Sequence, residues 1–277
     1  MKMWFYEKHN ENYQVAWRVS DILYQKKTPY QNLTVVEFAE LGRALVLDEA
    51  VQTTEKEEYV YHEMLVHPAA FTHKAPRKAL IIGGGDGGTL REVLKHETIE
   101  KVDLVEIDEE VIKAAREYLP FLSQSFNDPR VNIIIDDGIR FVKNVKNTYD
   151  LIFVDASDPV GPAVVLYSEE FYRSLFDALK EDGVVSVQSE SPNFYPEIFT
   201  KIVTTLKDIF PVVNIALAPV PAYISGFFAF TVASKCYNPK EVIPKINFAT
   251  KYYNEDIHQA CFALPNFVKE MLKSANL

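Results

Sequence analysis

The pattern of hydrophobic and polar positions changes near residue 55. Before this point the chain holds short runs rich in β-branched residues that stop at turn residues, as strands do. The runs are QVAWRVSDILYQKK (14–27), LTVVEFAE (33–40) and RALVLDEAVQTT (43–54). Gly42 predicts a hairpin turn between the last two. Since no long helical segment separates these runs, residues 1–55 are predicted to form a small antiparallel β domain.

Residues 56–277 alternate apolar strands with helices, after a linking helix expected in TEKEEYVYHEMLVHPAAF (54–71). The strands are predicted in KALII (78–82), KVDLVEI (101–107), RVNIII (130–135), DLIFV (150–154) and GVVSVQ (183–188). The helices between them are predicted in GTLREVLKH (88–96), DEEVIKAAREYL (108–119), DGIRFVKNV (137–145) and SEEFYRSLFDALKE (168–181). This is the spacing of βαβ units, so the predicted fold class is α/β, a Rossmann-like doubly wound sheet preceded by the small antiparallel β domain.

One segment carries no charge over 26 positions, from Ile209 to Ser234. Its length would allow a membrane span, but Pro211, Pro219 and Pro221 interrupt it. We therefore predict two buried strands with a proline-rich connection, at the far edge of the sheet.

Composition and charge exclude several classes of protein. The net charge is −10 and no run of Lys or Arg exceeds two residues, which argues against nucleic-acid binding and suits a cationic substrate. Cys236 and Cys261 form no CxxC motif, so neither a disulfide scaffold nor a zinc site is expected. Because MKMWFYEKHNENYQ (1–14) lacks an apolar signal segment, a cytoplasmic location is predicted, with no membrane partner.

Five of the ten glycines lie in IIGGGDGGT (81–89), directly after the first strand of the second region. Gly83, Gly85 and Gly88 match the G-x-G-x-x-G pattern of a nucleotide-binding turn, which usually presents backbone N–H groups to an anion. Asp86 lies inside this turn, and it would repel the pyrophosphate of a dinucleotide by roughly 4 kcal/mol at ~4 Å. A nucleoside without phosphate but with a cationic sulfonium, as in S-adenosyl compounds, fits the turn better than NAD.

Acidic residues also follow the next strands, whose carboxyl ends meet at one edge of such a sheet. Glu106 stands 23 residues after Gly83 (106 − 83), where an acid commonly binds ribose hydroxyls. Asp108 is placed to cap the helix that follows. Asp137 and Gly138 suit the edge of an adenine, and Asp137 can cap its helix as well.

A fourth strand end carries two acids, Asp155 and Asp158, in DASDPVGP (155–162). Two carboxylates beside a nucleoside could bind a metal, carry out acid–base chemistry or hold an amine. Asp158 could also be a turn residue only, because Asp often precedes Pro in turns. No metal is predicted, since none of the six histidines shows a ligand motif and HEMLVH (62–67) lacks the spacing of H-E-x-x-H.

These residues together resemble the spermidine synthase family of aminopropyltransferases, over nearly the whole chain. The matching segments are YQNL (30–33), LVLDEAVQTTEKEEYVYHEML (45–65), GGGDGG (83–88), VEID (105–108), DDG (136–138), DASDPVGPAVVLY (155–167), ALKEDG (178–183) and KYYNEDIHQACFALPNF (251–267). The resemblance implies the methyltransferase-type variant of the Rossmann-like sheet. It also implies transfer of the aminopropyl group of decarboxylated S-adenosylmethionine to an amine, with methylthioadenosine as the second product.

The resemblance further implies a role for each site residue. Asp86 would bind the ammonium that decarboxylation leaves on the donor, and Asp155 would be the base. The other donor-binding residues would be Gln31, Gln52, Glu106, Asp137, Gly138 and Pro162. The acceptor amine would be positioned by Tyr61 and His62, expected at the end of the linking helix, and by Asp158 and Tyr223. Apart from the resemblance, Glu190 after the fifth strand is either a further acid of this wall or a solvated acid at the strand end. No cofactor is implied beyond the nucleoside co-substrate, and the family is typically a homodimer or homotetramer.

Two departures from the family pattern bear on the acceptor. Ala156 replaces the usual Ser or Thr, and PAYISG (221–226) has Ala222 and Ile224 where PTYPSG is typical. Putrescine, which would give spermidine, is the first expectation, but agmatine, cadaverine or a triamine stay open.

Three other functions stay open. A methyltransferase on the same fold is disfavoured by Asp86, because an intact donor carries a carboxylate that this acid would repel. A non-catalytic polyamine or nucleoside sensor, or a dimerisation scaffold, is disfavoured by the presence of both Asp155 and Asp158. An NAD-dependent hydride-transfer enzyme is the most distant, since Asp86 takes the space of a phosphate.

Overall fold

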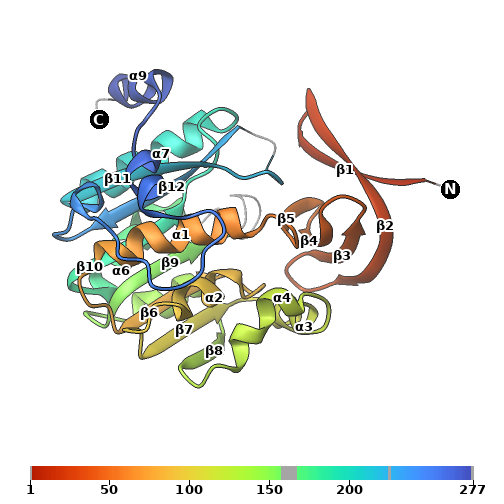
Figure 1. Ribbon diagram of the computed structural model, residues 1–277, viewed down its shortest axis with the longest axis horizontal. Helices are drawn as coiled ribbons and strands as arrows, with labels where there is room; N and C mark the ends of the chain where they lie inside the picture. The colour runs from red at the N-terminus through yellow and green to blue at the C-terminus, as the bar shows by residue number, and fades with distance from the viewer. Residues whose placement is uncertain (1, 157–166, 224–225, 276–277) are drawn as a thin grey trace.

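The structure, a computed structural model, describes residues 2–156, 167–223 and 226–275. Two sheets organise the chain, one at each end of the view in Figure 1. The first contains β1 (Met3–Asn10), β2 (Tyr13–Lys27), β3 (Asn32–Phe38), β4 (Gly42–Leu47) and β5 (Ala50–Thr54), each antiparallel to the next. The predicted N-terminal antiparallel sheet is confirmed. The domain boundary predicted after residue 55 falls between β5 and the first helix.

Tight turns with left-handed backbone shape this sheet. Gly42 has a φ of 76° in the hairpin that joins β3 to β4, as the sequence predicts. The run 43–54 is not one strand but two, because the chain reverses at Asp48 and Glu49, whose φ angles are 44° and 68°.

The second sheet has seven strands in the order β11-β12-β10-β9-β6-β7-β8. Their bounds are β6 (Lys78–Gly83), β7 (Lys101–Glu106), β8 (Val131–Ile135), β9 (Tyr149–Asp155), β10 (Leu179–Gln188), β11 (Val212–Pro219) and β12 (Phe227–Ser234). The strands β6 to β10 are parallel, and β12 is antiparallel to both of its neighbours. The predicted doubly wound sheet is therefore confirmed. The uncharged segment forms the two strands β11 and β12, and no helix within the described residues is long and apolar enough to span a membrane.

Helices cover both faces of the second sheet (Figure 1). They are α1 (Tyr59–Thr72), α2 (Gly88–Leu94), α3 (Glu109–Tyr118), α4 (Pro120–Ser123), α5 (Gly138–Lys143), α6 (Glu169–Ala178), α7 (Pro196–Ile209), α8 (Glu255–Cys261) and α9 (Asn266–Ser274), with 3-10 turns at Gln124–Asn127 and Pro239–Glu241. The core under α1, α2 and α3 contains Ile81, and the core under α5, α6 and α7 contains Ile82. Successive residues of a strand point to opposite faces, so burial of both faces explains the uninterrupted apolar runs.

Two helix boundaries differ from the sequence pattern. α6 ends at Ala178, because Leu179 already pairs with Tyr149 in the sheet, whereas the helical pattern continues to residue 181. α1 begins at Tyr59, so Tyr61 and His62 lie in its first turn and not at its end. The first turn of α1 is therefore the part of the linking helix that meets the candidate site.

The strand order reverses between β6 and β9, since β6 pairs with β7 on one side and with β9 on the other. In open α/β sheets a ligand binds beyond the carboxyl ends of the strands at such a switch point. The strands β6 and β9 end at Gly83 and Asp155, which are paired neighbours in the sheet.

Candidate active site

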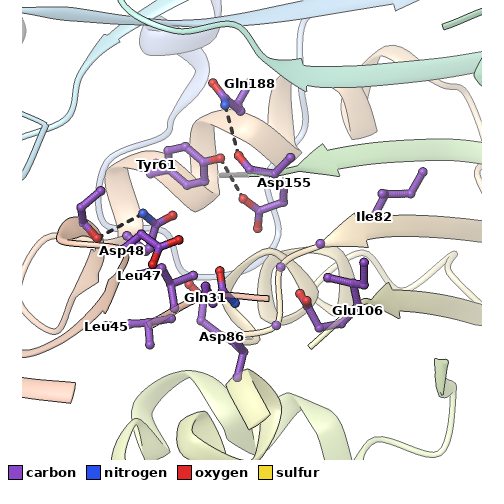
Figure 2. A pocket seen from close by; sticks show the side chains of 18 of the residues that line it. Gln31, Leu45, Leu47, Asp48, Tyr61, Ile82, Asp86, Glu106, Asp155 and Gln188 are labelled. Atoms are coloured by element: carbon purple, nitrogen blue, oxygen red, sulfur yellow. Dashed lines mark hydrogen bonds between the residues drawn. The ribbon is translucent and has the colours of Figure 1, made fainter. Parts of the chain in front are cut away.

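A cavity of about 450 Å³ lies at this switch point, between the two sheets (Figure 2). Every predicted site residue within the described ranges lines it: Gln31, Gln52, Tyr61, His62, Asp86, Glu106, Asp137, Gly138, Asp155, Glu190 and Tyr223. Asp158 and Pro162 lie outside the described residues, as does Ile224. The fold thus brings side chains from both predicted regions of the chain to one cavity.

Close backbone approaches explain the glycines of the loop after β6. A Cβ at Gly83 would overlap the carbonyl oxygen of Asp155, and the N–H of Gly84 donates to that oxygen at 3.0 Å. A Cβ at Gly85 would lie 2.7 Å from Oε2 of Glu106. Side chains at these positions would therefore push away the acids that follow β9 and β7.

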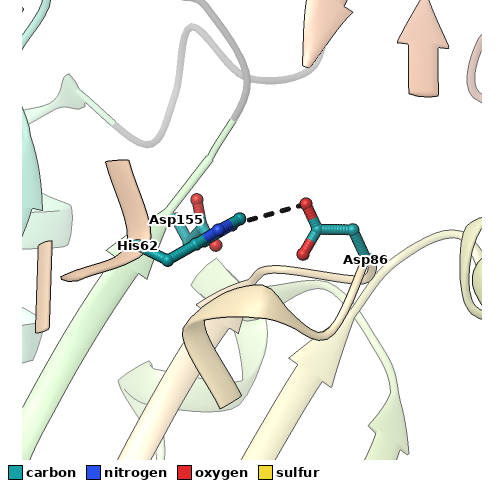
Figure 3. Close-up of side chains that lie close together, drawn as sticks. All are labelled: His62, Asp86 and Asp155. Carbon is teal, nitrogen blue, oxygen red and sulfur yellow. Dashed lines mark ion pairs between the residues drawn. The ribbon is translucent and has the colours of Figure 1, made fainter. Parts of the chain in front are cut away.

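Asp86 and His62 form a buried ion pair beside this loop (Figure 3). Oδ2 of Asp86 lies 3.5 Å from Nε2 of His62, and Oδ1 accepts the N–H of Gly88 at 2.7 Å. Burial acts to raise the pKa of Asp86, but the charge and hydrogen bond of His62 outweigh it and hold that pKa below its usual value. Burial acts to lower the pKa of His62, but Asp86 and Glu58 raise it well above the usual range. Both shifts favour an anionic Asp86 beside a cationic imidazole.

Asp155 faces this pair from the end of β9. Its Oδ1 accepts from the hydroxyl of Tyr61 at 2.8 Å and its Oδ2 from that of Thr89 at 2.7 Å. Burial first, and then the negative charge of Asp86, raise the pKa of Asp155. One polar atom each of His62, Asp86 and Asp155 lies within 4.8 Å of the others, so these three groups meet in one part of the cavity. The absence of a metal stays a prediction.

Glu106 lines a different part of the cavity. It is 8% exposed, its Oε1 accepts the N–H of Asp108 at 2.9 Å, and burial raises its pKa to about 7. Asp108 caps α3 as the sequence predicts. Asp137 caps α5 by accepting the N–H of Ile139 at 2.8 Å, so its predicted capping role is present.

The N-terminal sheet closes the cavity through side chains that reach the second sheet. Nε2 of Gln31 donates to Oδ2 of Asp108 at 3.0 Å. The hydroxyl of Tyr223 donates to the backbone carbonyl of Gln52 at 2.6 Å, and the ring of Tyr223 lies edge-on to that of Tyr61, with 5.7 Å between centroids. The walls of the cavity are thus tied across both sheets.

Sequence reasoning missed part of the wall, which includes Glu7, His9, Gln188 and Tyr195, and it also missed Thr89 behind Asp155. Glu7 is only 5% exposed, and its carboxylate accepts from Nε1 of Trp17 at 3.0 Å and from the N–H of Val51 at 2.8 Å. One signal could have found it, since a lone acid within the aromatic strand MWFYEKHN is unusual. Thr89 and Gln188 carry no such signal.

Two family models match the chain. Residues 58–244 match the model described as spermine/spermidine synthase domain. Residues 3–55 match the model described as spermidine synthase tetramerisation domain. Together the two matches cover both sheets and every predicted site residue.

Curated relatives and solved structures agree with the two family models. Polyamine aminopropyltransferases of Thermoanaerobacter sp. (strain X514) and Moorella thermoacetica are 47% and 49% identical, each alignment spanning 98% of this chain and 99% and 97% of the relative. A crystal structure of spermidine synthase in complex with the transition-state analogue AdoDATO superposes with a TM-score of 0.96 at 42% identity, over 98% of this chain and 95% of that one. Spermidine synthase from Thermotoga maritima gives a TM-score of 0.94 at 42% identity, over 98% and 94%.

Proposed function

This chain belongs to the spermine/spermidine synthase family of polyamine aminopropyltransferases, and we propose that it transfers the aminopropyl group of decarboxylated S-adenosylmethionine to putrescine. The products would be spermidine and methylthioadenosine. Family membership confirms the resemblance seen in the sequence and identifies an aminopropyltransferase enzyme. It sets aside the methyltransferase, the NAD-dependent enzyme and the non-catalytic protein.

The observation that carries the proposal is the buried carboxylate of Asp86 inside the glycine loop. Intact S-adenosylmethionine would bring its own carboxylate against this acid. The decarboxylated donor brings only an ammonium, which an ionised Asp86 attracts. The charge of Asp86 therefore supports the decarboxylated donor over the intact one.

The rest of the donor would lie along the wall that contains Glu106 and Asp137. An ionised Glu106 would accept from the ribose hydroxyls, and Asp137 with Gly138 would meet the adenine. Gln31 and Gln52 lie on the same cavity wall and would close over the nucleoside. Pro162 keeps its predicted place in this set as a proposal.

The acceptor would lie on the side of the cavity that holds Asp155, Tyr61 and Tyr223, with Asp158 as a further proposed contact. Glu7 and Glu190 line the same cavity and are 5% and 2% exposed. Further acids in the wall support an acceptor with a second cationic group, because acidic walls attract positive charge. A diamine meets that requirement.

The reaction needs a neutral amine, whereas an alkylamine is protonated at neutral pH. Asp155 would take the proton as the amine nitrogen loses its water and approaches the donor carbon. The new C–N bond forms as the C–S bond breaks, its electron pair stays on sulfur, and neutral methylthioadenosine leaves. Orientation of two cations by the acids of the cavity would supply much of the rate.

The test is a panel of acceptors. The protein is incubated with decarboxylated S-adenosylmethionine and putrescine, cadaverine, agmatine or spermidine in separate tubes, and the products are weighed by mass spectrometry. One aminopropyl unit added to putrescine, with methylthioadenosine released, is the expected result. A gain on another amine alone would overturn putrescine as the acceptor, and no gain on any amine would overturn aminopropyl transfer to these acceptors.

Asp86→Asn tests the donor assignment. We expect the variant to bind the decarboxylated donor at least tenfold more weakly while its affinity for methylthioadenosine changes little, because only the donor carries the ammonium. Isothermal titration calorimetry measures both affinities. Equal losses for the two ligands would show that Asp86 only shapes the turn.

The N-terminal sheet supports a proposal about assembly. β1 and β2 expose large hydrophobic side chains at Met3, Trp4, Tyr6 and Ile22, which are 41–57% exposed in a single chain. With the match to a tetramerisation domain, this supports a homo-oligomer, dimer or tetramer, built through that sheet. Sedimentation of the purified protein tests it, and a monomer at micromolar concentration would overturn it. A cytoplasmic location and the lack of any cofactor stay predictions.

A further inference from the structure

A line of charged side chains leads from the cavity into the protein behind it. Asp86 contacts His62, Nδ1 of His62 lies 2.7 Å from Oε2 of Glu58, and Arg91 holds both oxygens of Glu58 at 2.8 Å. The side chains of His62 and Glu58 are each 2% exposed. Glu58, just before α1, and His62, in its first turn, thus connect the glycine loop after β6 to α2.

The position of His62 is fixed on three sides. Glu58 lies at one ring nitrogen and Asp86 at the other. The ring also packs against Gly88, where a Cβ would overlap it. Each ring nitrogen faces a carboxylate, and an ionised carboxylate only accepts hydrogen bonds. Both nitrogens therefore donate only when the ring carries two protons, so this arrangement holds His62 as an imidazolium.

This cation gives Asp86 and Asp155 different electrostatic surroundings. Asp86 receives a charged donor from His62 and a backbone N–H, whereas the hydrogen bonds to Asp155 come from the neutral hydroxyls of Tyr61 and Thr89. The directions of the shifts agree, with the pKa of Asp86 lowered and that of Asp155 raised. Environments that push two titrating groups apart assign them different roles in acid–base chemistry.

We propose that Glu58, braced by Arg91, is a positioning residue of the reaction. It holds His62 as a fixed cation against Asp86. Asp86 therefore stays ionised, and Asp155 is the carboxylate that accepts the proton. The charged or titratable groups that face His62 are Glu57 and Glu58 from just before α1, Asp86 from the glycine loop and Asp155 from β9, with Arg91 of α2 behind Glu58. The role of this cation in the reaction rests on the functions proposed above for Asp86 and Asp155. The positive charge of His62 itself does not depend on those functions.

The charge of His62 is measured directly in the free protein. Nitrogen and proton NMR of the histidine side chains distinguishes an imidazolium from a neutral ring, and His62→Gln identifies the signal. We expect His62 to be charged at pH 7 and to lose its proton at least one pH unit lower in Glu58→Gln than in the unmodified protein, because the hydrogen bond can remain but the charge is gone. A neutral His62 at pH 7 in the unmodified protein, or the same titration in both proteins, would overturn the proposal.

The consequence for the reaction is measured with the same variant. Glu58→Gln should lower kcat/KM for the decarboxylated donor at least tenfold and leave methylthioadenosine affinity within about twofold. The acid limb of its pH profile of kcat/KM should move to higher pH by about one unit, because Asp86 and Asp155 would then compete for one proton. An unmoved pH profile contradicts the positioning role.

Glu92→Gln is the matched control. Oε1 of Glu92 accepts from Nε of Arg91 at 2.7 Å, so the substitution removes a buried charge from the same arginine without touching His62. We expect the pH profile of this variant to match that of the unmodified enzyme. A fall in donor kcat/KM equal to that of Glu58→Gln, or a parallel loss of methylthioadenosine binding, would mean that Glu58 only supports the fold. An unmodified protein that transfers no aminopropyl group would instead contradict the proposed function, and the NMR result would still report the charge of His62.

Discussion

At the scale of single residues, Asp155 is the proposed base, and burial raises its pKa. A carboxylate that titrates above its usual value is a better proton acceptor than an ordinary aspartate, and its hydrogen bonds to Tyr61 and Thr89 orient it toward the cavity. Asp155→Asn keeps the shape and these two neighbours but cannot take a proton. We expect kcat to fall by about 10²–10⁴-fold with methylthioadenosine affinity retained. Single-turnover kinetics measures the effect, and near-native turnover would exclude Asp155 as the base.

Glu106 predicts a pH effect on nucleoside binding. Its pKa of about 7 in the free protein means that it is half protonated at pH 7. In the proposed complex the ribose hydroxyls would donate to the ionised form, so binding should lower this pKa and release about half a proton at pH 7. Affinity for methylthioadenosine should therefore rise with pH and level off above 7. Calorimetry in two buffers of different ionisation enthalpy counts the proton; its absence in Glu106→Gln is the control, and proton uptake would contradict the assignment.

How far the sequence predicts the site depends on where each residue stands in the chain. Asp86, Glu106 and Asp155 follow parallel strands, and the carboxyl ends of such strands meet at one edge whatever the details of packing. Glu7 meets the backbone of Val51, 44 residues further on, and Glu58 meets Arg91, 33 residues further on, so local spacing does not reveal these partners. A sequence therefore predicts the acids at strand ends but not the groups that set their charge.

At the scale of elements, α1 is held by a clamp on the C-terminal segment. The carboxylate of Glu63 is 1% exposed and accepts the N–H groups of three successive residues, Lys251, Tyr252 and Tyr253, each at 2.8 Å. Hydrogen bonds to a charged group are among the stronger ones in proteins. The clamp therefore fixes residues 251–253, which precede α8, against the helix that carries Tyr61 and His62.

Removal of the clamp should loosen the C-terminal segment. We expect Glu63→Ala to lower the free energy of unfolding by roughly 2–4 kcal/mol, because three N–H groups, of which that of Tyr253 is buried, lose their acceptor. Urea unfolding measures the loss, and hydrogen exchange at residues 251–253 should become faster. Glu63→Gln, which keeps one carbonyl oxygen, should lose less. Unchanged exchange at these residues would show that other contacts hold the segment.

Element boundaries show where local pattern gives way to pairing. The helical spacing of SEEFYRSLFDALKE extends to residue 181, yet Leu179 joins β10 because its backbone pairs with Tyr149. The run 43–54 reads as one strand, yet Asp48 and Glu49 turn it into two. In both cases the type of element is correct, and its ends depend on partners that the local sequence does not contain.

At the scale of the whole molecule, a net charge of −10 should draw cationic substrates to the cavity. We expect kcat/KM for the decarboxylated donor to fall several-fold as salt rises from about 0.01 to about 0.1 M, because the screening length shrinks from ~30 to ~10 Å. Methylthioadenosine is neutral, so its affinity should hardly change. Initial rates and calorimetry over this range measure both, and equal salt sensitivity would exclude electrostatic steering.

Near the start of α1, three consecutive side chains reach three different parts of the molecule. Tyr61 reaches Asp155, His62 reaches Asp86, and Glu63 reaches the C-terminal segment. Each residue added to a helix rotates all later ones by about 100° about its axis. One residue inserted between Tyr61 and Glu63 would therefore turn at least one of these side chains away from its partner. Many single substitutions would disturb only the contact of the substituted residue. Over evolutionary time, this part of α1 should therefore tolerate substitutions far more readily than insertions or deletions.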